Sequence, residues 1–330
     1  MKCIVTGVAG FIGSTLCEIL LSQGFEVVGI DSFTGYYPRI LKEKNIERLK
    51  KSSKFVFIEG NLLDLDLSTI ISDNDFVFHQ AAQAGVRASW GENFHIYIEN
   101  NIRATQSLLE VCKKRNIKRL IFASSSSVYG DCKDIPMSEN SIPAPVSPYG
   151  VSKLASEQLC YLYWKNFNVP VISLRYFTVY GPRQRPDMAF NKFITAILKD
   201  KEIIMYGDGE QTRDFTYIDD IVTANILAMS RGQDGRVYNI GGGSRVSLNN
   251  VIDMLAKITG KKPKIKQSDT QKGDMRHTFA DIKRAKNELG YEPTVKLEEG
   301  LEKEYIWLKE KLRFFSRSAP SDAVMNEVKE

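Results

Sequence analysis

The chain has 330 residues, of which 43% are hydrophobic and 26% are charged, and this composition is typical of a globular protein with one large or two closely packed domains. The formal net charge is only +5, and no basic stripe alternates with aromatic residues, so we expect no nucleic-acid partner. No apolar run has the length of a membrane span or the pattern of a signal peptide, so we expect no membrane partner. Five widely spaced cysteines indicate reduced thiols and a cytoplasmic location, and they argue against a disulfide framework or a zinc site, so no metal is expected.

Strands and helices are predicted to alternate through the first half of the chain. Short apolar runs predict strands, and longer runs with apolar residues at helical spacing predict helices. The predicted strands are residues 2–6, 25–30, 55–58, 76–79 and 119–123, and the predicted helices are residues 11–22 and 94–114. A polar loop is expected from Asp31 to about Arg39. This order is typical of the α/β class with a Rossmann-type, doubly wound parallel sheet.

The second half of the chain contains shorter predicted elements with more frequent breaks between them. A helix is predicted from Tyr149 to about Asn166, ahead of a strand at residues 169–174. From Gly181 onward, prolines, glycines and charges separate shorter elements, at residues 190–198, 203–206, 219–230 and 248–259. We expect these to form a smaller C-terminal α/β substrate domain against the carboxyl edge of the sheet. The segment from about Phe314 has no periodicity and is expected to be frayed or linker-like.

A glycine-rich turn between the first strand and the first helix predicts a dinucleotide site. Gly7, Gly10 and Gly13 form a GxxGxxG pattern, which lets the backbone approach a pyrophosphate at a helix N-terminus. Asp31 follows the second strand, where a carboxylate accepts hydrogen bonds from the adenosine ribose and repels a 2′-phosphate, so NAD is favoured over NADP. Asn61 either holds the adenine edge or has only a turn role.

Tyr149 and Lys153 form a candidate catalytic pair. They lie four residues apart, about one helical turn, so their side chains share a face. A nearby ammonium favours the ionised phenol, and a phenolate can act as a general base toward a substrate hydroxyl. The serine cluster from Ser124 to Ser127 precedes this pair, as expected for a catalytic site at the end of a strand.

Together these motifs resemble the extended short-chain dehydrogenase/reductase family of nucleotide-sugar enzymes, over about residues 2–312. The resemblance rests on the glycine turn, the segment 79–82, the serines before Val128, the Tyr149–Lys153 pair and the segment 213–215. The segments 83–87, 177–182 and 185–189 are most similar to the UDP-glucuronate 4-epimerase branch. Residues 1–180 are then expected mainly to bind NAD, residues 181–312 mainly to bind the nucleotide sugar, and residues 313–330 to form a tail.

The resemblance implies a cycle in which the cofactor is regenerated. Tyr149 takes the proton of the sugar 4-hydroxyl while hydride passes from carbon 4 to NAD, and Ser125 shares that proton with the 4-oxygen. Lys153 lowers the pKa of the tyrosine and holds the nicotinamide ribose. The 4-keto sugar then rotates and the hydride returns to its other face, so NAD stays bound.

The resemblance also implies two sets of contact residues. The cofactor contacts are Gly7, Gly10, Phe11, Ile12, Gly13, Asp31, Asn61, Leu62, Ala81, Asn101, Tyr149, Lys153 and Tyr176. The contacts with the UDP-sugar are Arg87, Ser125, Ser126, Ser127, Thr178, Arg185, Tyr206, Arg213, Asp274 and Arg276. Within the second set, Arg213 is expected to bind the diphosphate and Tyr206 to cover the uracil. Asp274 or Arg276 is expected to reach the uridine ribose. The alternative for these two residues and for Tyr206 is a purely structural packing role without substrate contact.

Residue types at the sugar pocket separate related activities. The 4,6-dehydratases need an acid and a base where this chain has Ser126 and Ser127, and the related UDP-glucuronate decarboxylases usually have Glu in place of Ser127. An uncharged wall that includes Thr178 suits the carboxylate of a uronate. Arg185 either reaches that carboxylate or faces solvent.

Some alternatives stay open at this point. The common UDP-glucose 4-epimerases have Asn in place of Thr178 and Arg in place of Gln271, and the family often has Asp in place of Asn61. A UDP-glucose or UDP-N-acetylglucosamine 4-epimerase is therefore the main alternative. A UDP-glucuronate decarboxylase and a noncatalytic NAD-binding protein are less favoured alternatives. The helices at 94–114 and 150–166 resemble the pair that forms a four-helix bundle in family dimers, so a homodimer is expected.

Overall fold

The computed structural model describes residues 1–318, with side chains described as far as Phe314. Its centre is a parallel sheet of seven strands in the order β10-β6-β5-β4-β1-β2-β3. These strands are β1 (Lys2–Thr6), β2 (Glu26–Asp31), β3 (Phe55–Glu59), β4 (Phe76–His79), β5 (Arg119–Ser125), β6 (Val171–Tyr176) and β10 (Val237–Ile240). The strand order reverses between β1 and β4, and in such sheets ligands bind outside the carboxyl ends of the strands at that point. The predicted fold class is confirmed.

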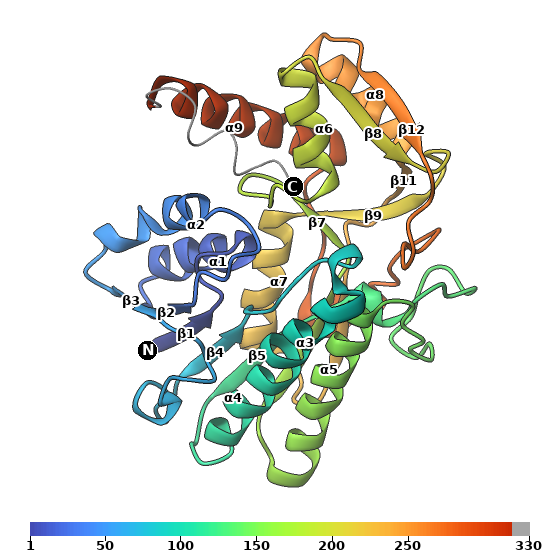
Figure 1. Cartoon of the computed structure of the whole chain (residues 1–330). Helices are drawn as coiled ribbons and strands as arrows, with labels where there is room; N and C mark the ends of the chain where they lie inside the picture. Colours follow the sequence, from blue (N-terminus) through green and yellow to red (C-terminus); the bar gives the residue numbers. More distant parts are fainter. Residues whose placement is uncertain (319–330) are drawn as a thin grey trace.

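Helices cover both faces of this sheet (Figure 1). Helices α1 (Phe11–Ser22) and α7 (Ile218–Arg231) pack together on one face, and α4 (Ala104–Cys112) and α5 (Pro148–Phe167) pack together on the other. Successive residues of β1 alternate between the two cores: Cys3 and Val5 belong to one cluster of buried side chains and Ile4 to the other. Because both faces are buried, the strands are almost continuously apolar, which explains why short apolar runs identified most of them.

The smaller half of the molecule is built from short elements after residue 177. Strands β7 (Thr178–Tyr180), β9 (Thr212–Tyr217) and β11 (Arg245–Ser247) form a three-stranded sheet, and β8 (Glu202–Tyr206) pairs with β12 (Lys264–Ser268). Helices α6 (Ala189–Leu198) and α8 (Leu248–Thr259) pack beside them. Between these segments the chain returns to the large sheet to add β10.

Several features differ from the sequence-based expectations, and strands β7, β9, β10, β11 and β12 were not predicted. The helix expected at residues 94–114 is α3 (Phe94–Tyr97), a π-helical segment at Ile98–Arg103, and α4. Helix α2 (Arg39–Ile46) follows the loop after β2 and was not predicted. Helix α9 (Leu297–Ser318) continues through the first residues of the expected tail, and residues 319–330 lie outside the described part of the chain. Within residues 1–318, no helix is long and apolar enough to cross a membrane.

Candidate active site

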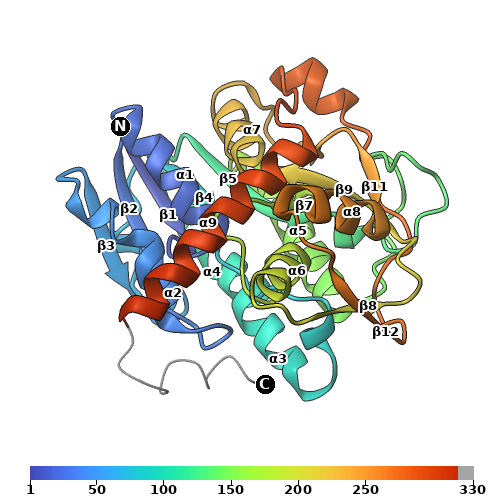
Figure 2. The same ribbon diagram turned by 90° about the horizontal axis from the view of Figure 1, so that it is seen from above.

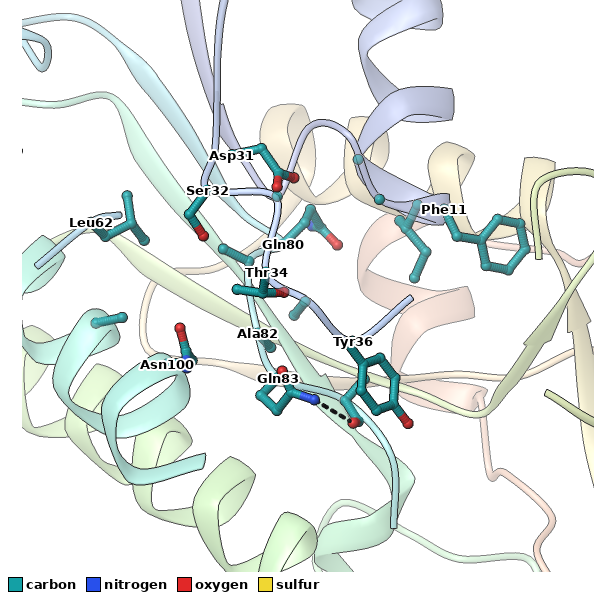
Figure 3. A pocket seen from close by; sticks show the side chains of 18 of the residues that line it. Phe11, Asp31, Ser32, Thr34, Tyr36, Leu62, Gln80, Ala82, Gln83 and Asn100 are labelled. Atoms are coloured by element: carbon teal, nitrogen blue, oxygen red, sulfur yellow. Dashed lines mark hydrogen bonds between the residues drawn. The ribbon is translucent and has the colours of Figure 1, made fainter. Parts of the chain in front are cut away.

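A cleft runs along the carboxyl ends of β1, β2, β4 and β5, at the point where the strand order reverses. The glycine turn and the loop after β2 line one side, residues 80–84 the floor, and Tyr149 and Lys153 the far end. Figure 3 shows Asp31 at the end of β2 and Ser32 and Thr34 on the loop after it, with Asn100 opposite them. The cleft therefore joins the predicted dinucleotide site to the predicted catalytic pair.

The glycine turn is tight enough to exclude side chains. Gly7 has a φ of 71°, and a Cβ placed on Gly13 would lie 2.2 Å from the carbonyl oxygen of Gly7. Helix α1 then begins at Phe11 after Gly10, which offers no side-chain cap. The first N–H groups of a helix have no intrahelical partner, and here they face a groove without a cap, so they are available to an anionic group such as a pyrophosphate.

Asp31 is held rigidly at the end of β2. Its Oδ2 accepts a hydrogen bond from the Ala9 N–H at 3.0 Å, and its Oδ1 accepts one from the Phe33 N–H at 2.9 Å. Burial raises the pKa of Asp31, and the two N–H donors and the charge of Lys42 act in the opposite direction. Lys42, which sequence reasoning missed, also lines the cleft, but its Nζ already donates to the Thr34 carbonyl oxygen at 2.6 Å. The strand end therefore holds a carboxylate, whose lysine neighbour is already hydrogen-bonded, at the edge of the cleft.

Helix α5 positions the catalytic pair at its N-terminus. The Ser147 hydroxyl caps the helix by accepting from the Gly150 N–H at 3.1 Å. Tyr149 and Lys153 both line the cleft, one turn apart. Lys153 donates from Nζ to the Ala123 carbonyl oxygen at 2.7 Å, and burial lowers its pKa to about 8.

Two neighbouring groups favour the ionised form of Tyr149 in the structure. Burial raises the pKa of Tyr149, while a hydrogen bond with Ser125 and the positive charge of Arg185 act in the opposite direction. The groups that favour the phenolate are therefore Ser125 and Arg185, and the effect of Lys153 on the tyrosine stays a prediction.

Arg185 lies in the cleft and does not face solvent. Its side chain is only 21% exposed, and Nε and Nη2 each lie 2.9 Å from a carboxylate oxygen of Asp187. Asp187 also accepts a hydrogen bond from the Tyr36 hydroxyl at 3.1 Å. This network holds the guanidinium near Tyr149, so the solvent-facing alternative is excluded.

The serine cluster continues from β5 into one 3₁₀ turn. Ser125 ends the strand, and its Oγ accepts from the Ser127 N–H at 3.1 Å. Ser126 and Ser127 are buried in the turn, and the partly buried Thr178 begins β7. These four residues have short hydroxyl side chains, and neither position 126 nor position 127 is an acid.

Directly behind the serines lies a buried ionic network that sequence reasoning missed. Glu157, one turn after Lys153, accepts hydrogen bonds from Ser124 Oγ at 2.6 Å and from Arg175 Nη2 and Nε at 2.6 and 3.0 Å. Arg175 also donates to the Tyr129 hydroxyl at 2.8 Å. The network ties the helix that holds Tyr149 to the strand that holds Ser125. The only sequence signal was a set of charged residues within otherwise apolar segments.

Four of the predicted nucleotide-binding side chains gather at the other end of the site. Arg87 lies 4.1 Å from the centre of the Tyr206 ring and 2.6 Å from the Asp274 carboxylate. Burial lowers the pKa of Arg213, and the negative charge of Asp274 acts in the opposite direction. Asp131 acts on Arg213 in the same direction as Asp274. Arg87 and Arg213 are nevertheless two guanidinium groups close together, and their planar forks suit a diphosphate.

Arg276 and Asn101 differ from the rest of the predicted site. Both guanidinium Nη atoms of Arg276 lie 2.8 Å from the Asp208 carboxylate, so this arginine is already paired. Asn101 is buried behind the cleft wall, where its amide bonds the backbone of Gln83 and the Ser152 hydroxyl. Asn100 lines the cleft in its place. The other predicted cofactor residues line the cleft: Gly7, Gly10, Phe11, Ile12, Gly13, Asp31, Asn61, Leu62, Ala81, Tyr149, Lys153 and Tyr176.

Known proteins resemble this chain over nearly its whole length. A UDP-glucuronate 4-epimerase of Thermodesulfobacterium geofontis is 40% identical over 314 residues, which cover 94% of this chain and 96% of the relative. A protein of Bacillus subtilis described as the uncharacterized UDP-glucose epimerase YtcB is 46% identical over 310 residues, covering 93% and 98%. The solved UDP-glucuronic acid 4-epimerase from Bacillus cereus, in complex with UDP-glucuronic acid and NAD, is 49% identical, with a TM-score of 0.92 and coverage of 94% of this chain and 100% of its own. A family model matches residues 3–241, and the chain belongs to the NAD dependent epimerase/dehydratase family.

Proposed function

We propose that this protein is an NAD-dependent 4-epimerase that interconverts UDP-glucuronate and UDP-galacturonate. The observation on which this proposal depends is the position of Tyr149, between Ser125 and Arg185, in a cleft that begins at the glycine turn. The relatives from Thermodesulfobacterium geofontis and Bacillus cereus, with their printed activities, support the substrate.

The cleft fits the cofactor. Gly7 and Gly13 leave room only for backbone, the uncapped start of α1 suits the pyrophosphate, and Asp31 suits the adenosine ribose. Tyr176 and Lys153 line the end where the nicotinamide would lie. When bound, NAD supplies the acceptor and donor of the hydride at sugar carbon 4.

The protein's own part is to move one proton and to hold the sugar. Tyr149 takes the proton of the 4-hydroxyl, and Ser125 shares a hydrogen bond with the same oxygen. A neutral phenol is a poor base, so the positive charge of Arg185 and the Ser125 hydroxyl favour the ionised form against the cost of burial. Lys153 stays bonded to Ala123 and would hold the nicotinamide ribose.

The uronate carboxylate would contact the hydroxyl wall. Ser126, Ser127 and Thr178 offer hydroxyl and backbone donors without an opposing acid, and Arg185 adds a cation. The 4-keto intermediate of a uronate is a β-keto acid, which loses carbon dioxide fastest when the carboxyl bond stands perpendicular to the ketone plane. Several donors on the carboxylate would hold it away from that orientation and favour epimerisation.

Product analysis tests the proposal. The protein is incubated separately with UDP-glucuronate, UDP-glucose and UDP-N-acetylglucosamine, and the products are separated by chromatography. We expect UDP-galacturonate from the first substrate at the highest rate, with little decarboxylated product. Faster conversion of UDP-glucose would reject the carboxylate assignment and favour the main alternative, which the name of the Bacillus subtilis relative supports.

Two variants sharpen this test. Thr178→Ala and Ser127→Ala should each weaken the binding of UDP-glucuronate by about ten- to a hundredfold, because a charged group loses one hydrogen bond worth about 1.5–3 kcal/mol. They should also raise the decarboxylated fraction. Ser230→Ala, whose hydroxyl bonds only the backbone of its own helix, is the matched control and should change neither.

A cycle that returns the hydride in each turnover predicts tightly held cofactor. The purified protein is denatured, and the released nucleotide is measured. We expect NAD or NADH in a ratio approaching one per chain. A preparation that is free of nucleotide and yet active without added NAD would contradict the proposed mechanism.

We also propose that the protein is a cytoplasmic homodimer. The outer face of α5 exposes Val151, Tyr161 and Leu162, which are 44–48% exposed, and Ile98 lies in the adjacent π-helical segment. Two copies of this face would form a four-helix bundle. All five cysteines are unpaired, which supports the cytoplasmic location.

The dimer proposal is tested with Leu162→Glu. Light scattering after size-exclusion chromatography should give twice the chain mass for the parent protein and the mass of one chain for this variant. Ile142→Glu, at an apolar loop residue that is 86% exposed, is the control and should leave the mass unchanged. A parent protein with the mass of one chain would refute the proposal.

A further inference from the structure

A second cavity lies behind the loop that holds Arg185. It has a volume of about 570 Å³, which is in the usual range for small-molecule sites of about 300–1,000 Å³. Helices α1 and α2, the loop at residues 182–186 and the last turns of α9 surround it. Figure 2 shows α9 crossing the molecule toward α2 above this region. The cavity shares Tyr37 and Arg185 with the active-site cleft but is otherwise lined by different residues.

Arg183 contributes an unpaired donor to the cavity. Its Nη2 lies 2.6 Å from Glu18 Oε1, but its Nη1 is buried and has no hydrogen-bond partner in the described part of the chain. The residue also has a φ of 73°, a left-handed conformation that is unfavourable for an arginine. A strained backbone and an unsatisfied guanidinium nitrogen both cost free energy, and such a combination is more often found at binding sites than in plain structural positions.

Lys311, on α9, is another cation that lines the cavity, besides Lys44, Arg48, Arg183 and Arg185. Its ammonium group lies 4.7 Å from the centre of the Trp307 ring, and within residues 1–318 no carboxylate pairs with it. Burial lowers its pKa to about 8, with no acid acting in the opposite direction. The comparable buried cations Arg175 and Arg185 each have a bidentate carboxylate. A partly buried lysine without a carboxylate partner, in the same cavity as an unpaired arginine nitrogen, is the arrangement expected where a ligand supplies the negative charge.

The rest of the lining restricts the kind of ligand. The aromatic rings of Trp307 and Phe314 offer a flat apolar surface. The acids Asp219 and Glu310 also line the cavity, and Lys44 at its rim is already paired with Glu47. A head group with one or two negative charges therefore fits better than a polyphosphate, which would be repelled by these carboxylates.

We propose that Arg183 and Lys311 bind the oxyanion head, a phosphate or a carboxylate, of a small molecule whose ring packs on Trp307, at a site distinct from the sugar-nucleotide cleft. The bound ligand lies directly behind the loop that places Arg185 beside Tyr149. The head group accepts hydrogen bonds from Arg183 Nη1 and from the Lys311 ammonium, which satisfies both donors.

The test uses the full-length protein with NAD, in the presence of saturating UDP so that the active-site cleft is occupied. Phenyl phosphate, benzoate and inorganic phosphate are titrated by calorimetry, and the fluorescence of Trp307 is followed by comparison with Trp307→Phe. We expect one saturable site for phenyl phosphate or for benzoate, and the stronger of these two identifies the head group. Inorganic phosphate, which lacks the ring, should bind more weakly.

Variants decide whether the binding occurs in this cavity. Lys311→Met and Arg183→Met should each lower the affinity by about ten- to a hundredfold, as expected for the loss of a hydrogen bond to a charged group. Lys309→Met is the matched control, since Lys309 is on the same helix but stacks on Tyr305 and does not line the cavity. Lys311→Met removes a partly buried charge without a carboxylate partner, so it is expected to fold even if Arg183→Met does not. The absence of saturable binding up to about 10 mM, a free energy weaker than about −3 kcal/mol, would overturn the proposal. An affinity that Lys311→Met leaves unchanged would do the same.

Discussion

Replacing Glu157 by glutamine should destabilise the protein severely, although the two side chains have nearly the same shape. Glu157 is 1% exposed and its carboxylate is the only acid that pairs with Arg175, which is 3% exposed, in the described chain. A glutamine oxygen can still accept from Arg175 Nη2, and Ser124 can reverse its hydrogen bond. The negative charge and one of the two bonds from Arg175 are nevertheless lost. Removing one partner of a buried ion pair costs about 3–5 kcal/mol, and the retained hydrogen bonds place Glu157→Gln near 3 kcal/mol.

The measurement is urea unfolding followed by circular dichroism, with the same cofactor content in each sample. The control is Glu299→Gln, whose pairing with Lys303 is exposed on α9 and should be worth less than about 1 kcal/mol. The double variant Glu157→Gln/Arg175→Met should recover much of the loss, because no buried charge is then left without a partner. A single variant within about 1 kcal/mol of the parent, or a double variant no more stable than the single one, would show that the pair does not hold α5 against β5 and β6 in the way described.

Three further predictions concern the cleft and the second cavity. Tyr149→Phe should lower kcat by about 100–10,000-fold while calorimetry shows unchanged UDP-sugar binding, and retention of a tenth of the parent rate would contradict its role as the base. Asp31→Ala should weaken NAD binding by about ten- to a hundredfold and NADP binding by less, as measured by fluorescence titration, and equal losses would argue against its contact with the ribose. Burial lowers the pKa of Lys311 from 10.5 to about 8, so the unfolded state binds more protons between these values and the unfolding free energy should rise with pH across that window. In Lys311→Met, the free energy of unfolding from urea curves should no longer rise with pH in this window. If the rise persists in the variant, the pH dependence belongs to another titratable group.

The parts of the site that sequence analysis placed correctly are local in the chain. The glycine turn, Asp31 and the Tyr149–Lys153 pair each depend on a few residues next to a strand end or a helix start. Parallel strands bring such ends to one edge of the sheet, so order along the chain was enough to predict that these residues share a cleft.

The parts that sequence analysis missed depend on contacts between distant segments. Glu157 and Arg175 lie on different elements, and nothing in their spacing indicates that each is the other's counter-charge. The sequence could not decide whether Arg185 points into the cleft or toward solvent, because only the fold shows that Asp187 holds it in the cleft. The spacing of Lys153 correctly predicted a shared helix face, but it did not reveal that the Ala123 carbonyl takes up the ammonium group.

Helix α9 connects the smaller half of the molecule, after residue 177, to the half that is built on the large sheet; these two halves are called the lobes below. It starts against α6, α8, β7 and β9, its Glu304 accepts the Gly181 N–H at 2.8 Å, and its Phe314 ring lies 4.2 Å from the Lys44 ammonium on α2. A hinge-like opening of the lobes would have to detach one end of this helix, whereas the ion pair of Arg87 with Asp274 is exposed and easily broken. We therefore expect sugar nucleotides to enter and leave the cleft at the Arg87 end. The two lobes stay closed and retain the bound dinucleotide from one turnover to the next.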